Sequence, residues 1–66
     1  MALVDEVLRR DHETTLENFL SYRRANSTSY EIIARELSAM VGVNGFTVGY
    51  QTARRWCKRL GIKAAS

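Results

Sequence analysis

The sequence contains no proline, only four glycines and a single cysteine. The lack of proline and the scarcity of glycine argue against a disordered or loop-rich chain and favour helices. One cysteine excludes an intramolecular disulfide and a cysteine-based metal cluster, so a reducing, cytosolic compartment is the simpler expectation. His12 is the only histidine, and nothing around it indicates a metal site or a catalytic pair.

The chain is short, and this limits what it can do. A domain of 66 residues holds one modest core and no deep cleft. We find no paired carboxylates suited to a pocket, no nucleophile with a base and no phosphate-binding glycine loop, so we expect neither an enzyme nor a cofactor. The longest apolar runs are too short to span a membrane, and acids occupy the N-terminus where a secretory signal has bases. We therefore expect a cytoplasmic protein, associated with the nucleoid if its source is a bacterium or a phage.

Charge is distributed unevenly along the chain. Residues 1–22 carry Arg9 and Arg10 against a majority of acids, whereas residues 46–66 contain no acid at all. The cations of that C-terminal part are Arg54, Arg55, Lys58, Arg59 and Lys63. Positive charge concentrated at one end is the pattern expected of a protein that binds a polyanion.

Residues 2–25 are predicted to be helical, but their apolar residues change face. The first half contains Leu3, Val4, Val7 and Leu8, and the second half contains Leu16, Phe19 and Leu20. At about 100° per residue these two sets drift apart. Two arrangements fit this pattern. In the first, the helix breaks near Arg9–Asp11 and a new helix begins with Asp11 or Thr14 as its N-cap, since Thr14 and Glu17 fit a capping box. In the second, one long helix presents two different apolar faces. The Leu3–Leu8 patch is accordingly either core or the contact surface of a homodimer.

A second helix is predicted over residues 29–41. Thr28 and Glu31 fit a capping box after the polar turn 26–29. The apolar residues of this helix fall within an arc of about 120°, a wide core-facing stripe. They are Tyr30, Ile33, Ala34, Leu37, Met40 and Val41. Ile32 points away from that stripe, and Gly42 is a natural helix stop.

The segment after Gly42 has two interpretations. Asn44-Gly45 between apolar residues is a strong hairpin signal, so one interpretation is a short two-stranded excursion at Val41–Val48. The alternative is a turn that is longer than the tightest connections between helix pairs.

The third predicted helix, residues 47–60, has two different faces. Thr47 is its expected N-cap, and Gly61 with Ile62 has the pattern of a C-terminal stop. Its apolar stripe consists of Ala53, Trp56, Cys57 and Leu60. A lone thiol and a tryptophan on such a stripe are interpreted as core residues.

The opposite face of this helix carries the candidate site. The residues expected to contact DNA are Thr47, Tyr50, Gln51, Arg54, Arg55, Lys58 and Arg59. Arginine can bond guanine O6 and N7 in the major groove, and glutamine can bond adenine N6 and N7. Lys58 and Arg59 suit phosphates, which supply affinity and register. Tyr50 suits either packing or a phosphate contact. The alternative interpretation of the basic face is an ordinary solvated surface.

Residues 29–37 (SYEIIAREL) and 50–62 (YQTARRWCKRLGI) together resemble a helix-turn-helix of the resolvase/transposase (homeodomain-like) and small phage-regulator kind. The matching positions are Ile33, Ala34, Leu37, Thr52, Trp56, Gly61 and Ile62. Ala53 and Cys57 replace a larger Val and Leu of the pattern, and the Gly42–Phe46 connection is longer than the family's turn. The resemblance implies a supporting helix followed by a recognition helix, and it suggests a phage or mobile-element origin.

These features predict an all-α fold, a three- or four-helix bundle containing a helix-turn-helix, with residues 1–66 as one domain. The expected function is sequence-specific binding of double-stranded DNA, as a small transcriptional regulator such as a repressor, or as a recombination-directing factor. The alternative is a protein-interaction module whose helical surface binds another protein, such as RNA polymerase or a host factor.

Overall fold

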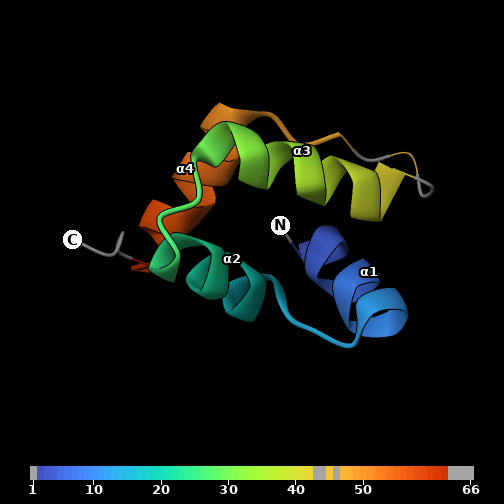
Figure 1. Ribbon diagram of the computed structural model, residues 1–66. Helices are drawn as coiled ribbons and strands as arrows, with labels where there is room; N and C mark the ends of the chain where they lie inside the picture. Colours follow the sequence, from blue (N-terminus) through green and yellow to red (C-terminus); the bar gives the residue numbers. More distant parts are fainter. Residues whose placement is uncertain (1, 43–44, 46, 63–66) are drawn as a thin grey trace.

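Four helices form in the computed structural model of the protein, which describes residues 2–42, 45 and 47–62. They are α1 (Ala2–His12), α2 (Leu16–Ala25), α3 (Tyr30–Val41) and α4 (Tyr50–Arg59). Figure 1 shows α3 along one side of the molecule and α1 and α2 along the other, with α4 behind α3 and reaching toward α2. None of the described residues is in a strand, so the all-α prediction is confirmed for them. The hairpin considered for Val41–Val48 rests on residues 43, 44 and 46, which lie outside the described residues.

The N-terminal segment is two helices, and the chain breaks at residues 13–15 rather than near Arg9–Asp11. Glu13 has a left-handed backbone conformation, with φ of 51°. Thr15 is the N-cap of α2, and its side chain accepts a hydrogen bond of 3.1 Å from the Asn18 N–H. The predictions of Asp11 or Thr14 as N-cap were therefore wrong. A cap at Thr15 makes Leu16 the first residue of α2, where it is buried in the core.

The break explains why the apolar residues change face. Val4, Val7 and Leu8 are buried in the same core as the α2 residues, because the two helices approach that core from different directions. Only Leu3 of the patch is exposed, at 60%. The predicted dimer contact through Leu3, Val4, Val7 and Leu8 is therefore wrong for three of its four residues, which already pack inside the protein.

Asp5 connects α1 to the start of α2. Its Oδ1 accepts a hydrogen bond of 2.8 Å from the Leu16 N–H, which has no partner within α2, and its Oδ2 accepts one of 2.8 Å from Arg9 Nε. The Leu16 N–H and, less strongly, Arg9 hold the pKa of Asp5 below its ordinary value. The carboxylate thus acts as a cap supplied by a neighbouring helix.

The turn between α2 and α3 is tightly hydrogen-bonded. Ser27 is left-handed, with φ of 59°, its N–H donates to Arg24 O, and the Thr28 N–H donates to Arg23 O. This is a Schellman motif with serine where glycine is usual. Because Thr28 belongs to this motif, Ser29 is the N-cap of α3 instead of the predicted Thr28, and its Oγ accepts from the Ile32 N–H at 3.3 Å.

Two arginines near the end of α2 fasten it to α3. Arg23 forms an ion pair of 2.7 Å with Glu36. Arg24 stacks over the Tyr30 ring, 4.2 Å from its centroid, and donates a hydrogen bond to Thr28 O. Both guanidinium groups therefore serve the fold.

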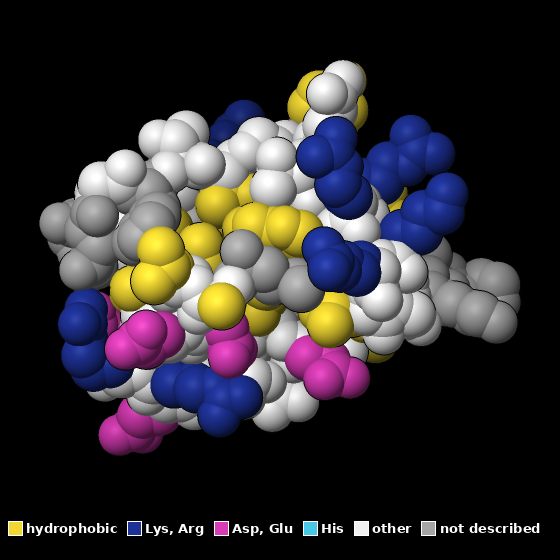
Figure 2. All heavy atoms as spheres, turned by 180° about the vertical axis from the view of Figure 1, so that it is seen from behind, with side chains coloured by type: hydrophobic (Ala, Val, Ile, Leu, Met, Phe, Trp, Pro, Cys, Tyr) yellow, Lys and Arg dark blue, Asp and Glu magenta, His cyan; other side chains and the backbone are white. Residues whose placement is uncertain are grey.

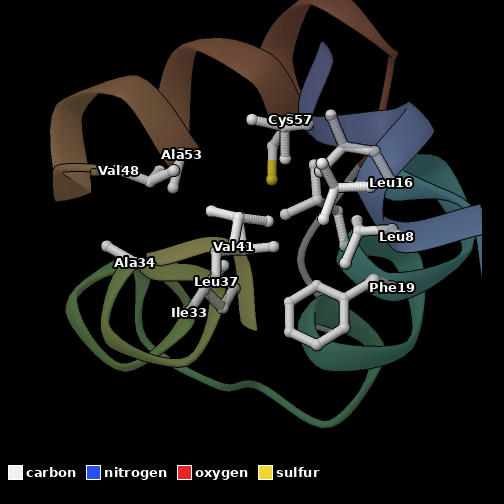
Figure 3. Packing of buried hydrophobic residues seen from close by; sticks show 13 residues of the cluster. Leu8, Leu16, Phe19, Ile33, Ala34, Leu37, Val41, Val48, Ala53 and Cys57 are labelled. Carbon is white, nitrogen blue, oxygen red and sulfur yellow. The ribbon is translucent and has the colours of Figure 1, made fainter. Parts of the chain in front are cut away.

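One hydrophobic core joins all four helices (Figure 3). The α3 stripe is confirmed in large part, since Ile33, Ala34, Leu37 and Val41 are buried, while Tyr30 and Met40 pack at its edge. Ile32 is exposed at 47% and finds no place in this core. Gly42 follows α3 in a right-handed conformation, so it is not the left-handed stop that the sequence predicted.

Ser27→Gly is expected to stabilise the fold by about 0.5–1 kcal/mol, because glycine adopts the left-handed conformation without the cost that a Cβ brings. Urea unfolding followed by circular dichroism measures the change. Ser21→Gly, at an exposed position inside α2, is the matched control and is expected to destabilise, since glycine weakens helix interiors. Equal losses in both variants would contradict the assignment of strain to Ser27.

Asp5 is expected to make stability depend on acidic pH. Since its pKa is lowered on folding, its contribution is complete above the pKa of the unfolded chain, about 4, and is lost as the pH falls through the lower pKa of the folded protein. Asp5→Asn should therefore be less stable than wild type near neutral pH and lose less stability on acidification. Urea unfolding at about pH 7 and about pH 3 tests this. Glu6→Gln, an exposed site on the same helix, is the control, and a similar effect there would refute a specific role for Asp5.

Candidate nucleic-acid interface

The candidate interface is α4 together with the extended segment before it. The helix begins at Tyr50, and Gly49 is its N-cap without a side-chain hydrogen bond, so the predicted start at Thr47 with Thr47 as N-cap was wrong. The reason is Val48, which is buried at 5% exposure and forms part of the core. Extended backbone at residues 47–49 places Val48 in the core, and α4 starts only after it.

Ser38 of α3 holds the beginning of this unit in place. Its hydroxyl donates a hydrogen bond of 3.0 Å to Val48 O and accepts one of 3.0 Å from the Val48 N–H. A single side chain thus satisfies both backbone groups of a buried residue, which would be costly to leave unpaired. No local sequence pattern marks Ser38, because its partner Val48 lies ten residues further along the chain, and its role in positioning α4 was therefore missed.

The inner face of α4 is narrow. Ala53 and Cys57 are fully buried, whereas Trp56 and Leu60 are half-buried and pack at the edge of the core. Figure 3 shows Ala53 and Cys57 directed toward the α3 residues Ala34 and Val41. Burial raises the pKa of the Cys57 thiol, only partly offset by Arg24, so the thiol is protonated and unreactive near neutral pH. Cys57 therefore acts as a small core residue.

The end of α4 follows the sequence prediction. Gly61 is left-handed, with φ of 72°, and the Ile62 N–H donates to Cys57 O at 2.9 Å. The Gly61 N–H donates to Lys58 O at 3.2 Å, which completes a Schellman motif. The half-buried Ile62 packs against the core, so the stop also fastens the end of the helix.

The outer face of α4 carries the predicted cations. At about 100° per residue, they and Gln51 cover an arc of about 140° of the helix surface. All these side chains are exposed: Gln51, Arg54, Arg55, Lys58 and Arg59. The helix therefore presents one continuous polar and basic face, while its other face is held by the core.

These cations have no acidic partner in the part of the chain that the structure describes. The ion pairs found there join Arg9 to Asp5, Arg10 to Asp11 and Arg23 to Glu36. In Figure 2, lysine and arginine side chains gather at the upper right, the side where α4 lies, whereas the acidic side chains lie along the lower edge together with further lysine or arginine side chains, and apolar side chains lie between. The charges on α4 are thus free to bind an external anion.

The remaining predicted site residues, Tyr50 and Thr47, lie at the N-terminal end of α4 and before it. Tyr50 is half-exposed, and its hydroxyl accepts a hydrogen bond of 3.2 Å from Gln51 Nε2. Thr47 is exposed in the extended segment, separated from the helix by the buried Val48. The fold therefore brings Tyr50 and Gln51 into contact and places Thr47 outside the helix.

Other features of the described part of the protein give no comparable indication of a binding or catalytic site. An open cleft of about 450 Å³ lies where α1, α2 and Leu60 meet, but its Asp5 and Arg9 already bond to each other. His12 Nε2 lies 3.2 Å from Met40 O and so links α1 to the end of α3.

Among the described residues there is no cluster of three or more His, Cys, Asp or Glu side chains that could hold a metal. No helix in the described ranges has the length and apolar character to cross a bilayer.

Ser38→Ala is expected to lower the free energy of unfolding by about 1–3 kcal/mol, because it leaves the Val48 N–H and C=O without a partner. Chemical denaturation measures the loss. Ser21→Ala, which removes an exposed hydroxyl from α2, is the control and should not destabilise, because alanine is the best helix former. If both variants were as stable as wild type, the Ser38 hydroxyl would not hold α4.

Comparison of the chain with protein-family models, with curated proteins and with solved structures finds no match. The resemblance of residues 29–62 to a helix-turn-helix therefore rests on the sequence pattern alone.

Proposed function

We propose that this protein binds double-stranded DNA by inserting α4 into the major groove, and that it acts as a small sequence-specific regulator of transcription or as a recombination-directing factor. The observation that carries the proposal is the unpaired basic face of α4, whose opposite face is anchored in the core by Ala53 and Cys57. A helix with these two faces suits insertion into a groove that admits one α-helix.

The chemistry of the outer face fits both parts of DNA recognition. Gln51, Arg54 and Arg55 are the base-reading candidates, since glutamine suits adenine and arginine suits guanine. Lys58 and Arg59, nearer the C-terminal end, are assigned to phosphates, which set affinity and register. The first N–H groups of α4 have no side-chain cap, and this leaves them available to a phosphate oxygen as well.

The rest of the molecule supports the same orientation. Acidic residues of α1, of α2 and of the turn between them are exposed, among them Glu6, Glu13 and Glu17, whereas α4 contains no acid. A polyanion would repel this acidic surface and attract the α4 side, so electrostatic steering favours approach with α4 in front. The helix-turn-helix role assigned to α3 and α4 is consistent with the packing of these two helices against each other in one core.

Lys58→Ala and Arg59→Ala are each expected to weaken binding to duplex DNA and to reduce the slope of log K against log salt concentration by about 1, because binding releases about one counterion fewer for each phosphate contact that is removed. Fluorescence anisotropy with a random-sequence duplex over a range of salt concentrations measures both quantities. Arg10→Ala is the matched control, because Arg10 lies on α1 and pairs with Asp11. It should leave the slope unchanged.

Two results would overturn the proposal. The first is that wild type has no affinity for duplex DNA even at low salt. The second is that Arg10→Ala reduces the slope as much as the α4 variants do, since charge at any position would then suffice. Absence of DNA binding combined with a specific protein partner would favour the alternative, a protein-interaction module that presents its basic face to an acidic surface.

A further inference from the structure

The contact between Tyr50 and Gln51 bears on which base α4 reads. Both side chains project from the first turn of the helix, and Gln51 Nε2 donates a hydrogen bond of 3.2 Å to Tyr50 Oη. Tyr50 is 50% exposed and Gln51 is exposed, so the pair lies on the surface. The first turn of a recognition helix is also the part that contacts base edges.

The hydrogen bond to Tyr50 limits which donor and acceptor groups of the Gln51 amide remain available to a base. A glutamine amide has two N–H groups and one carbonyl oxygen. If Tyr50 takes the N–H that points away from the carbonyl oxygen, the other N–H and that oxygen form a donor–acceptor pair along one edge of the amide. That pair matches the N7 acceptor and the N6 donor that adenine presents in the major groove.

The tyrosine hydroxyl keeps a function of its own in this arrangement. Because Oη accepts the hydrogen bond from Gln51, its own proton remains available to a phosphate oxygen. A phosphate bound there would polarise the hydroxyl and strengthen its bond to Gln51. Tyr50 would thereby connect the register of the DNA backbone to the orientation of the base-reading amide.

We propose that Gln51 selects adenine and that Tyr50 is the positioning residue that holds the Gln51 amide in the reading orientation. This inference rests on the proposed function, because it requires α4 to lie in the major groove. It goes beyond it by naming one base and one pair of residues. Neither residue belongs to the core, so replacing them leaves the packing of α4 intact.

Selection of binding sites from a random duplex pool tests the inference with wild type, Gln51→Ala, Gln51→Glu and Tyr50→Phe. Wild type should select an adenine at one position. Gln51→Ala should lose about 5- to 150-fold discrimination there, the range for a bidentate base contact, and Gln51→Glu should shift the preference toward cytosine, whose N4 donates. Tyr50→Phe should lose about 2- to 10-fold, the contribution of one neutral hydrogen bond.

The salt dependence of binding to random DNA separates the possible failures. Gln51→Ala and Tyr50→Phe leave every charge of the interface unchanged, so their salt slope should match that of wild type. A normal slope with an unchanged selected site in Gln51→Ala would overturn the adenine assignment and leave the proposed function standing. Adenine discrimination lost in Gln51→Ala but intact in Tyr50→Phe would overturn the positioning role. No duplex binding by wild type would overturn both proposals.

Discussion

The packing of α4 against α3 is the constraint on which the basic surface depends. Only Ala53 and Cys57 of α4 are fully buried, and both are small, so the helix lies close to the α3 side chains and its opposite face stays clear of the core. Val48 adds a second anchor just before the helix, with both of its backbone polar groups bonded to Ser38. The small buried residues of α4 and the hydrogen bonds of Ser38 thus determine how far the cations on the outer face of α4 project from the core.

The N-terminal half supports this arrangement from the other side of the core. Because the chain breaks between His12 and Leu16, two short helices bring Val4, Leu8 and Leu20 to the same interior. Asp5 makes that break possible by capping the start of α2 from α1. The same two helices carry exposed acids, so the half of the chain that completes the core also gives the molecule its charge asymmetry.

Much of α3 and α4 could be predicted from local pattern. The periodicity that marks Ile33, Leu37 and Val41 is a property of the helix itself, and the Gly61 stop requires only a residue that tolerates a left-handed conformation. The N-caps found in the structure, Thr15, Ser29 and Gly49, each lie one or more residues after the predicted ones. For Thr15 and Ser29 the reason is that neighbouring Ser and Thr residues have almost equal capping ability, and for Gly49 it is the burial of Val48. Which of them serves depends on the residues that must be buried next to it.

The sequence by itself determined the helical class, the buried stripes and the segregation of Arg54, Arg55, Lys58 and Arg59 from acids, because these follow from composition and from spacing within one helix. Only the tertiary structure decided that Val4, Val7 and Leu8 are core, that Ser38 bonds to Val48, and that Asp5 caps Leu16. Each of these features depends on contacts between residues that lie about ten or more positions apart in the sequence or on different helices. Such contacts arise from the competition of all apolar residues for one small interior, which no local pattern records.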